Sequence, residues 1–450
     1  MPLSDQVREV LDSTPDLQAV RNFLQVHATP HLRLDNFGLV RVRLEREFCK
    51  GLRFLFKAEA QNEQKQDLYF FGRTMTPSAG DALQAEINKK FFSDSSAGVF
   101  PSLRKAAVYS GDLKLLFQVF PVDQRLPSLA RAANPYFMKA ALGEILGKKR
   151  KDPILDEVKL SLVQYEPEKK CLFRYELDWR EHERQEAPTR ETVYGKVSRK
   201  VERTHNNLVR IHAAWRGTVF QIPEPVGIVP ELSMQLISSL PGVCLSNSYT
   251  DKEFSKICRQ VARGLLEFHN TTVGLNPEKD LAAEVSELNK WIEEFALILP
   301  GQAERIRNLS HKITKSLVCH ARAPLRPVHG DFNPANILVH CGSPSLLDFD
   351  HCYMGRPGVD VGSFYGELKL LALTQLNDPT ALDNGIHEFL DEYVNGCLPD
   401  YSETISAYCA LSCLWCAYFQ CILRPLQSGS VDRALVMLKL GEDALGKGQF

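Results

Sequence analysis

The sequence has almost no excess of charge of either sign. Its 54 lysine and arginine residues nearly balance 55 aspartate and glutamate residues over 450 positions. A chain this neutral creates no broad positive field, so its charge does not favour a nucleic acid or an anionic membrane surface as a partner. A local basic pocket for phosphate groups is compatible with this balance.

The N-terminal segment lacks the features of an export signal. Its first residues, MPLSDQVREVLDSTPDL, contain no basic stretch followed by an apolar one. The twelve cysteines are scattered and do not form the dense framework of a small secreted domain, which is typical of a protein in a reducing compartment. We therefore expect a cytoplasmic location.

Long apolar runs are also rare, with one exception. Residues 405–423 carry no charge and approach the ~20-residue length of a membrane helix. This stretch contains Ser406, Ser412 and Gln420 and lies between segments of ordinary polarity. A buried helix is therefore the favoured interpretation over a membrane span, and we expect no membrane partner.

The first half of the sequence predicts two sets of β-strands. Both sets are rich in β-branched and aromatic residues or alternate between apolar and polar positions. The first comprises residues 39–45, 52–57 and 68–71, and the second comprises residues 158–163, 171–177 and 192–197. Because 450 residues are too many for one ordinary core, we expect two or three domains.

The two sets have the spacing of a duplicated lobe. The tripeptide FGR at residues 71–73 falls at the same place in the first set as YGK at residues 194–196 in the second. Three pairs of residues are separated by nearly equal lengths of chain: Arg73 and Lys196, Pro101 and Pro223, and Gln118 and Gln235. Such regular spacing indicates an internal repeat. Because few residues are identical, chance similarity is the alternative.

The last part of the sequence predicts helices. Thr250 and Glu253 have the spacing of a capping box, which satisfies free backbone donors where a helix begins. An apolar face follows at helical spacing: Phe254, Ile257, Cys258, Val261 and Leu265. Further helical pattern covers residues 280–299 and continues from residue 363 onward, with breaks near Pro379 and Pro399.

Two short motifs carry the chemistry. Residues 328–336 read VHGDFNPAN, and residues 346–350 read LLDFD. Apolar residues border both motifs, so we expect Asp331 and Asn336 on one loop at a strand edge and Asp348 at the end of a neighbouring strand. An ordinary polar turn would explain Gly330 in the first motif, but it gives no reason for two aspartates in the second.

These residue types suit phosphoryl transfer. That reaction needs a carboxylate to orient the attacking hydroxyl, oxygen ligands for Mg²⁺ and a cation on the phosphates. Because Mg²⁺ prefers oxygen donors and keeps several waters, one Asp and one Asn are enough protein ligands. The spacing from Asp331 to Asn336 equals that between the catalytic Asp and the metal-binding Asn of protein kinases.

The motifs resemble the signature of the aminoglycoside phosphotransferase family, which also includes choline, homoserine-type and sugar kinases. In that family the loop has the pattern H-G-D-x-x-x-x-N and the metal motif has the pattern D-x-D or D-x-E. This sequence matches both patterns at every fixed position. Asp360, in the segment GVDV, resembles the family's later structural aspartate. The resemblance covers roughly residues 155–425. It implies a bilobal α+β fold of the protein-kinase type, with ATP and Mg²⁺ as cofactors.

The resemblance also implies a role for each residue of the motifs. Asp331 would be the catalytic base, and Asn336 and Asp348 would be Mg²⁺ ligands. Asp350 would be a further metal ligand or a neighbour of one. His329 would brace the loop rather than react.

The phosphate-binding cation is expected from the second set of strands. Lys196, in the segment VYGKV, is flanked by β-type residues like the lysine on the third strand of a kinase. A solvated strand lysine is the alternative. Glu202 is the only acidic residue between Lys196 and Glu224, so it is the predicted partner of the lysine by elimination.

Two features of protein kinases are missing. The turn at residues 164–170, QYEPEKK, has no glycine, so side chains would have to contact the phosphates there. Lys169 and Lys170 are candidates, and surface exposure is the alternative for both. No A-P-E triplet follows Asp348, which argues against a protein acceptor.

We therefore predict a β-rich cap domain at residues 1–150, which has the pattern of a duplicated N-lobe. A kinase N-lobe at residues 151–245 and a helical C-lobe at residues 246–450 would follow, the latter with the catalytic loop and acceptor pocket. The predicted activity is transfer of phosphate from ATP, with Mg²⁺, to a hydroxyl of a sugar, an aminoglycoside-like polyol or an amino alcohol. The alternative is a non-catalytic nucleotide-binding scaffold, against which the intact motifs count.

Overall fold

The computed structural model describes residues 3–12, 14–44, 51–61, 66–93, 105–148, 153–181, 189–250, 252–276, 278–319, 324–423 and 427–446. Contacts between Cα atoms divide the chain into two compact units. The sheet unit comprises residues 6–205 and 225–239, and the helical unit comprises residues 1–5, 206–224 and 240–450. The sheet unit thus contains both predicted sets of strands, whereas the three predicted domains, with boundaries at 150 and 245, stay a prediction.

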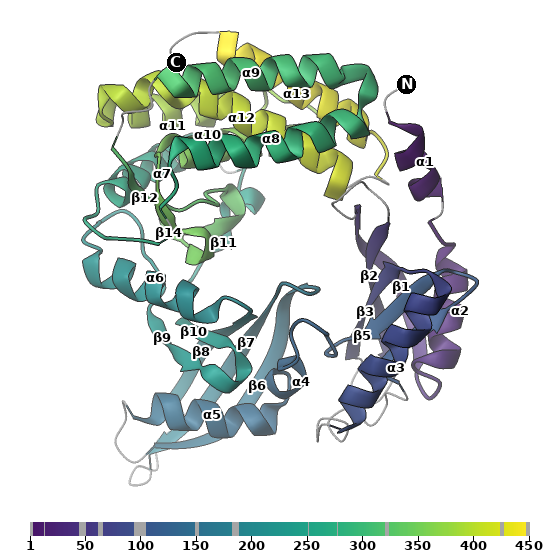
Figure 1. Cartoon of the computed structure of the whole chain (residues 1–450). Helices are drawn as coiled ribbons and strands as arrows, with labels where there is room; N and C mark the ends of the chain where they lie inside the picture. The colour runs from purple at the N-terminus through teal and green to yellow at the C-terminus, as the bar shows by residue number, and fades with distance from the viewer. Residues whose placement is uncertain are drawn as a thin grey trace. The chain divides into compact units, whose positions relative to one another are not determined.

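The first part of the sheet unit is a five-stranded antiparallel sheet (Figure 1). Its spatial strand order is β1-β2-β3-β5-β4. Short helix α1 (Asp5–Asp12) and helix α2 (Leu17–His27) precede it, and helix α3 (Pro77–Ser93) follows its third strand. The strands are β1 (Arg33–Leu44), β2 (Leu52–Gln61), β3 (Gln66–Thr74), β4 (Ala107–Ser110) and β5 (Leu115–Val119).

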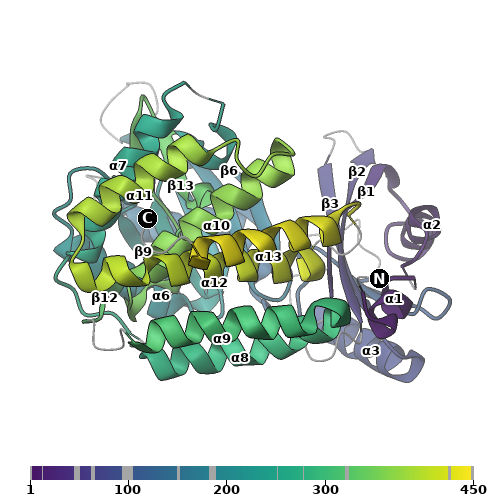
Figure 2. The same ribbon diagram turned by 90° about the horizontal axis from the view of Figure 1, so that it is seen from above.

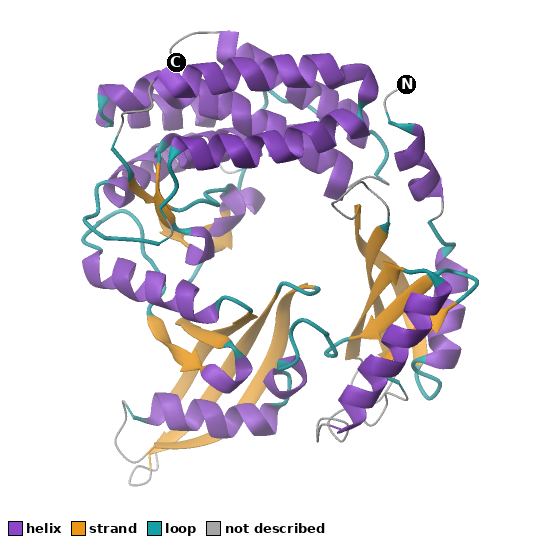
Figure 3. Cartoon of the chain, viewed as in Figure 1, coloured by secondary structure: helices purple, strands orange, loops and turns teal. Residues whose placement is uncertain are grey.

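A second five-stranded sheet repeats this plan with the order β6-β7-β8-β10-β9. Helices α4 (Leu129–Ala132) and α5 (Pro135–Gly147) precede it, and helix α6 (Val201–Ala214) again follows the third strand. Figure 3 shows the strands of both sheets in orange. The strands are β6 (Pro153–Glu166), β7 (Lys170–Glu181), β8 (Thr189–Ser198), β9 (Pro225–Val229) and β10 (Met234–Ser238).

Strand order and register support the predicted duplication. In the first sheet Gly72 pairs with Phe54 on one side and Phe117 on the other, and in the second sheet Gly195 pairs with Phe173 and Leu236. Both glycines lie against large buried side chains, because a Cβ atom would come within 3.2 Å of Phe117 at position 72 and within 2.6 Å of Tyr175 at position 195. The same backbone position thus needs glycine in each sheet.

The two glutamines used to align the repeats do not occupy equivalent positions. Gln235 pairs with Lys196, whereas Gln118 pairs with Phe71, and the residue opposite Arg73 is Leu116. The shift is two residues, which keeps both glutamines on the same face because side chains alternate along a strand. Pro101, which was aligned with Pro223, lies outside the described residues.

The helical unit contains a group of long helices that lie side by side (Figure 2). Helix α8 packs against α9, α9 packs against α12, and α12 packs against both α10 and α13, while α7 packs against α11. The bounds are α7 (Phe254–His269), α8 (Leu281–Ile298), α9 (Ala303–Cys319), α10 (Gly358–Gln375), α11 (Asp383–Gly396), α12 (Pro399–Leu423) and α13 (Ser430–Gly446).

The expected start of α7 is wrong. The helix begins at Phe254, and Glu253 occupies the N-cap position but its side chain does not cap a backbone N–H of the helix. The apolar face predicted from the sequence is nevertheless present, since Phe254, Ile257 and Val261 are all buried. Burial of the face, rather than a capping box, therefore accounts for this helix.

Helix α12 contains the uncharged stretch of the sequence. Among the described residues it is the one helix long and apolar enough to cross a membrane, and 72% of its most apolar window is buried inside the protein. Its four cysteines, Cys409, Cys413, Cys416 and Cys421, are all buried. Core helices of globular proteins have these same properties, which agrees with the interpretation as a buried helix.

Candidate active site

A two-stranded sheet and a three-stranded sheet of short strands in the helical unit carry the sequence motifs. Strand β12 (Arg326–Val328) pairs with β15 (Tyr353–Gly355), and β13 (Ile337–His340) pairs with both β11 (Val243–Cys244) and β14 (Ser343–Leu346). Asp331 follows β12, and Asn336 ends a 3-10 turn directly before β13. Asp348 follows β14 by two residues. The motifs thus lie at strand ends, as the sequence predicts.

The carboxylate of Asp331 is held by two amide side chains of its own loop. Nδ2 of Asn333 donates to Oδ1 of Asp331 at 2.9 Å, and Nδ2 of Asn336 donates to Oδ2 at 3.2 Å. Oδ1 of Asn333 in turn accepts the backbone N–H groups of Ala335 and Asn336. Because Nδ2 of Asn336 points at Asp331, its Oδ1 points elsewhere and is free to bind a cation.

The loop is joined to the second motif through Leu347. The backbone N–H of Leu347 donates to the carbonyl of Asn336 at 2.9 Å, and Nε2 of His329 lies 2.8 Å from the carbonyl oxygen of Leu347. Both polar groups of this residue are therefore fixed immediately before Asp348. His329 thus braces the loop, as the resemblance implied.

Asp348 has an unusual backbone conformation. Its φ of 62° and ψ of 64° lie in the left-handed region, which is uncommon for a residue with a Cβ atom. Such a conformation costs on the order of 1–3 kcal/mol and persists only where its surroundings enforce it. The hydrogen bonds on Leu347 provide such enforcement, and strain of this kind is typical of functional sites.

A buried carboxylate supports the start of the loop. Asp360, on α10, has no exposed surface and accepts the backbone N–H groups of His329 at 2.7 Å and Gly330 at 2.8 Å. Nε2 of His269 lies 2.9 Å from Asp360, and Nδ1 of His269 lies 2.7 Å from the hydroxyl of Tyr393. Since a carboxylate only accepts, the ring proton belongs on Nε2. The structural role implied for Asp360 therefore has a physical basis.

The donors around Asp348 suit a hard cation such as Mg²⁺. Asn336 offers an amide oxygen, and Asp348 and Asp350 offer carboxylate oxygens, which are the ligand types that Mg²⁺ prefers. Within the described ranges, no cluster of three or more His, Cys, Asp or Glu side chains could hold a metal by itself. Because Mg²⁺ in kinases takes part of its coordination from phosphates and water, this donor set fits it only together with a nucleotide.

The neighbouring thiol does not compete as a ligand. Cys352 is fully buried, and its pKa lies well above the usual value, first because of burial and then because of the negative charges of Asp360, Asp348 and Asp350. The thiol is therefore protonated at neutral pH and is a poor ligand for a hard cation.

The predicted phosphate-binding residues lie in the sheet unit. Lys196 is on β8 and is only 8% exposed. Glu202 is in the first turn of α6 and is exposed. In the part of the chain that the structure describes, it makes no ion pair with Lys196, so the pairing chosen by elimination is absent. A contact of either residue with a nucleotide stays a prediction.

Residues 195–396 match the family model described as the phosphotransferase enzyme family. This segment includes Lys196, both sequence motifs and Asp360. Together with the two units, this confirms the predicted α+β fold of the protein-kinase type, with an additional β-rich region before it. The matched region begins within the second sheet and ends with α11.

Solved structures with limited similarity include an ADP-bound aminoglycoside phosphotransferase. It has 15% identity and a TM-score of 0.44, and the match covers 68% of this chain and 99% of that chain. A choline/ethanolamine kinase family protein from Mesorhizobium loti has 15% identity and a TM-score of 0.42, covering 60% and 89%. An ethanolamine kinase from Plasmodium vivax has 12% identity and a TM-score of 0.43, covering 68% and 87%. A comparison with curated proteins finds no match.

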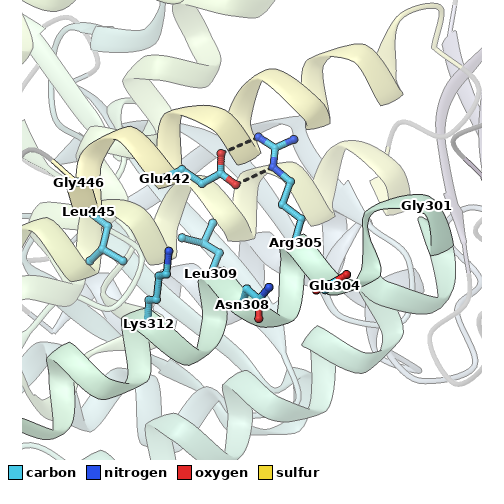
Figure 4. Close-up of a pocket in the computed structure, with 9 residues that line it drawn as sticks. All are labelled: Gly301, Glu304, Arg305, Asn308, Leu309, Lys312, Glu442, Leu445 and Gly446. Atoms are coloured by element: carbon cyan, nitrogen blue, oxygen red, sulfur yellow. Dashed lines mark hydrogen bonds and ion pairs between the residues drawn. The ribbon is translucent and has the colours of Figure 1, made fainter.

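A cavity of about 610 Å³ lies between α9 and α13. Figure 4 shows that Arg305 and Glu442 face each other there, with Nε–Oε1 and Nη2–Oε2 distances of 2.6 and 2.8 Å. None of its lining residues belongs to the loops that carry Asp331 and Asp348. This cavity is therefore not the acceptor pocket predicted beside the catalytic loop.

The conformation of Gly330 gives a first testable prediction for the candidate active site. Its φ is +76°, and a Cβ atom there would lie 2.5 Å from the carbonyl oxygen of His351. We expect Gly330→Ala to lower the free energy of unfolding by about 3 kcal/mol, since the backbone strain and the clash with His351 add. We also expect kcat/KM to fall by about 100-fold, since the loop that carries Asp331 would move. Urea unfolding and steady-state kinetics would measure the two effects.

Gly342 provides a matched control. It has nearly the same φ, +78°, but nothing lies within 4 Å of a Cβ atom added there. Gly342→Ala should therefore lower the free energy of unfolding only through backbone strain, by about 1 kcal/mol. It should retain activity. Equal effects of the two substitutions would contradict a tight contact at Gly330.

Proposed function

We propose that this protein transfers the γ-phosphate of ATP to a hydroxyl group of a small molecule in a Mg²⁺-dependent reaction. The main support is the hydrogen-bonded path from Asp331 through Asn336 to Leu347, the residue before Asp348. This path links the carboxylate of Asp331 to the residue before Asp348, which supports a joint role of the two aspartates. The match of residues 195–396 to the phosphotransferase family model supports phosphotransfer in general.

In the proposed reaction Asp331 acts as the general base. The acceptor oxygen forms a bond to the γ-phosphorus while the bond from that phosphorus to the β–γ bridging oxygen breaks, and ADP leaves. The proton of the acceptor hydroxyl passes to the carboxylate of Asp331, which the amides of Asn333 and Asn336 keep oriented. Mg²⁺, when bound with the nucleotide by Asn336, Asp348 and Asp350, would neutralise phosphate charge.

We propose a sugar, an aminoglycoside-like polyol or an amino alcohol as the acceptor. The aromatic ring of Tyr353 adjoins the catalytic loop, because a Cβ atom at Gly330 would lie 3.0 Å from it. Nearby, Tyr408 donates to Glu284 at 3.0 Å, and burial raises the pKa of Glu284. Arg356 lies 3.7 Å from the same carboxylate, so its charge is balanced and this group does not favour a cationic acceptor over a neutral one.

A screen of ADP release would test this function. Purified protein with MgATP would be assayed against sugars, aminoglycosides and amino alcohols, and its melting temperature would be measured with ATP, with and without Mg²⁺. We expect turnover with at least one acceptor and metal-dependent stabilisation by nucleotide. Stabilisation without any turnover would favour the non-catalytic scaffold. The absence of both stabilisation and turnover would contradict nucleotide binding. The cytoplasmic location stays a prediction.

Lys196 offers a direct test of nucleotide binding. If it neutralises phosphate charge, Lys196→Ala should lower kcat/KM for ATP by about 100-fold, the scale seen when one such electrostatic contact is removed. Lys200→Ala is the matched control, because Lys200 is exposed just beyond the same strand. Initial-rate kinetics at varied ATP would compare them. Equal kinetics of the two variants would exclude Lys196 as a phosphate ligand.

A further inference from the structure

The turn between β6 and β7 is held by the first sheet rather than left exposed. Glu168, at the tip of this turn, is only 4% exposed and has a φ of +65°. Its backbone N–H donates at 2.7 Å to Oδ2 of Asp123, which also accepts the hydroxyl of Tyr165 at 2.9 Å. These two hydrogen bonds to Asp123 are buried, so the segment after the first sheet fixes the backbone of the turn.

Two arginines of the first sheet fix the side chain of Glu168. Nη1 of Arg53, on β2, lies 2.6 Å from Oε2 of Glu168, and Nη1 of Arg73, on β3, lies 3.9 Å from Oε1. Arg53 and Arg73 are direct partners across the two strands. Since the carboxylate side chain is only 2% exposed, removing its charge would leave these cations without their buried partner.

The position of Arg73 connects this contact to the duplication. Arg73 follows Gly72 on the third strand of the first sheet as Lys196 follows Gly195 on the third strand of the second. In the second sheet this position is the candidate phosphate ligand. In the first sheet the corresponding cation binds a carboxylate of the same polypeptide, so an internal anion stands where a nucleotide phosphate would be expected.

The turn that is held has a known place in nucleotide binding. In the kinase fold the turn between the first two strands covers the phosphates, and glycines normally let its backbone approach them. Here residues 164–170 contain no glycine, and the exposed Lys169 and then Lys170 follow Glu168. Lys169 lies 2.5 Å from Glu166. A turn of this composition can contact phosphates only through its side chains. Those side chains reach the phosphates only if the backbone of the turn is held in the right position.

We propose that the first sheet is a clamp that uses Arg53 and Arg73 to hold Glu168 and so positions the β6–β7 turn for nucleotide binding. Glu168 is then a positioning residue, not a catalytic one. In this proposal the first sheet has no nucleotide site of its own and instead orders the β6–β7 turn of the second sheet. This inference rests on the proposed function, because it assigns the turn to the same nucleotide.

Kinetics of Glu168→Gln would test the clamp. This substitution keeps the size of the side chain and removes its charge. We expect KM for ATP to rise about tenfold, as a small displacement of a binding element can produce, while kcat at saturating ATP changes less than twofold. The double variant Arg53→Glu, Glu168→Arg exchanges the two charges, and it should restore part of the affinity for ATP. Glu176→Gln, at the Arg174–Glu176 pair on β7, is the control and should leave KM unchanged.

Hydrogen exchange separates the possible outcomes. In the wild type, amides of residues 164–170 should exchange slowly, and Glu168→Gln should accelerate them. Faster exchange with unchanged KM for ATP would overturn the positioning role and leave the proposed function intact. Unchanged exchange and unchanged KM would overturn the clamp itself. A wild-type protein that binds no MgATP and phosphorylates no acceptor would overturn the proposed function and, with it, this inference. Should Glu168→Gln not fold, Arg73→Gln gives the same comparisons.

Discussion

Asp331→Asn is expected to lower kcat by about 1,000-fold, the scale at which a positioned general base contributes. The substitution removes the proton acceptor but keeps the size and planarity of the side chain. Because an amide also loses one of the two oxygens that accept from Asn333 and Asn336, the loop loses part of its support. KM for ATP should change little, since Asp331 acts on the acceptor. Stopped-time assays of ADP release would measure the loss.

Asp391→Asn is the matched control for this substitution. Asp391 lies on α11 of the same unit and is exposed, so its replacement should leave kcat unchanged. Melting curves of both variants would show whether the loss of activity reflects unfolding. An Asp331→Asn protein that keeps a kcat within tenfold of the wild type would contradict the assignment of the base.

The candidate site could be predicted because its parts are close in sequence. Asp331 and Asn336 share one short loop, and a single hairpin of β13 and β14 brings Asp348 beside them. Each contact that joins them, such as the one from Leu347 to Asn336, follows from local backbone geometry. The duplication of the sheets could also be predicted in outline, since the glycines at positions 72 and 195 mark the same strand.

The remaining features depend on packing between distant segments. His269 lies 91 residues from Asp360 and 124 residues from Tyr393 in the sequence, and nothing in its local sequence sets it apart. The pairing of Glu202 with Lys196 was chosen by elimination, and the rotation of α6 instead leaves Glu202 exposed. Glu168 could not be identified because a turn of charged residues normally lies in solvent. Only the fold brings Arg53 to it.

Asp360→Asn should cause the largest loss of stability. The buried carboxylate accepts hydrogen bonds from the backbone of His329 and Gly330 and from the ring of His269. An asparagine has one acceptor oxygen and turns its NH₂ group toward one of these donors, so at least one buried donor loses its partner. We expect the free energy of unfolding to fall by about 3–5 kcal/mol, the scale for removing one partner of a buried charged group. Urea unfolding would measure it.

Tyr393→Phe separates the parts of this network. It removes only the hydroxyl that contacts Nδ1 of His269, so it should cost about 1 kcal/mol and leave the contacts of Asp360 to the loop intact. If Asp360 holds the loop directly, activity measured well below the melting temperature should fall strongly in Asp360→Asn and little in Tyr393→Phe. Equal losses of activity would place the loop's support in His269 instead, because both substitutions disturb its ring. Wild-type stability in Asp360→Asn would show that the two backbone N–H groups do not depend on this carboxylate.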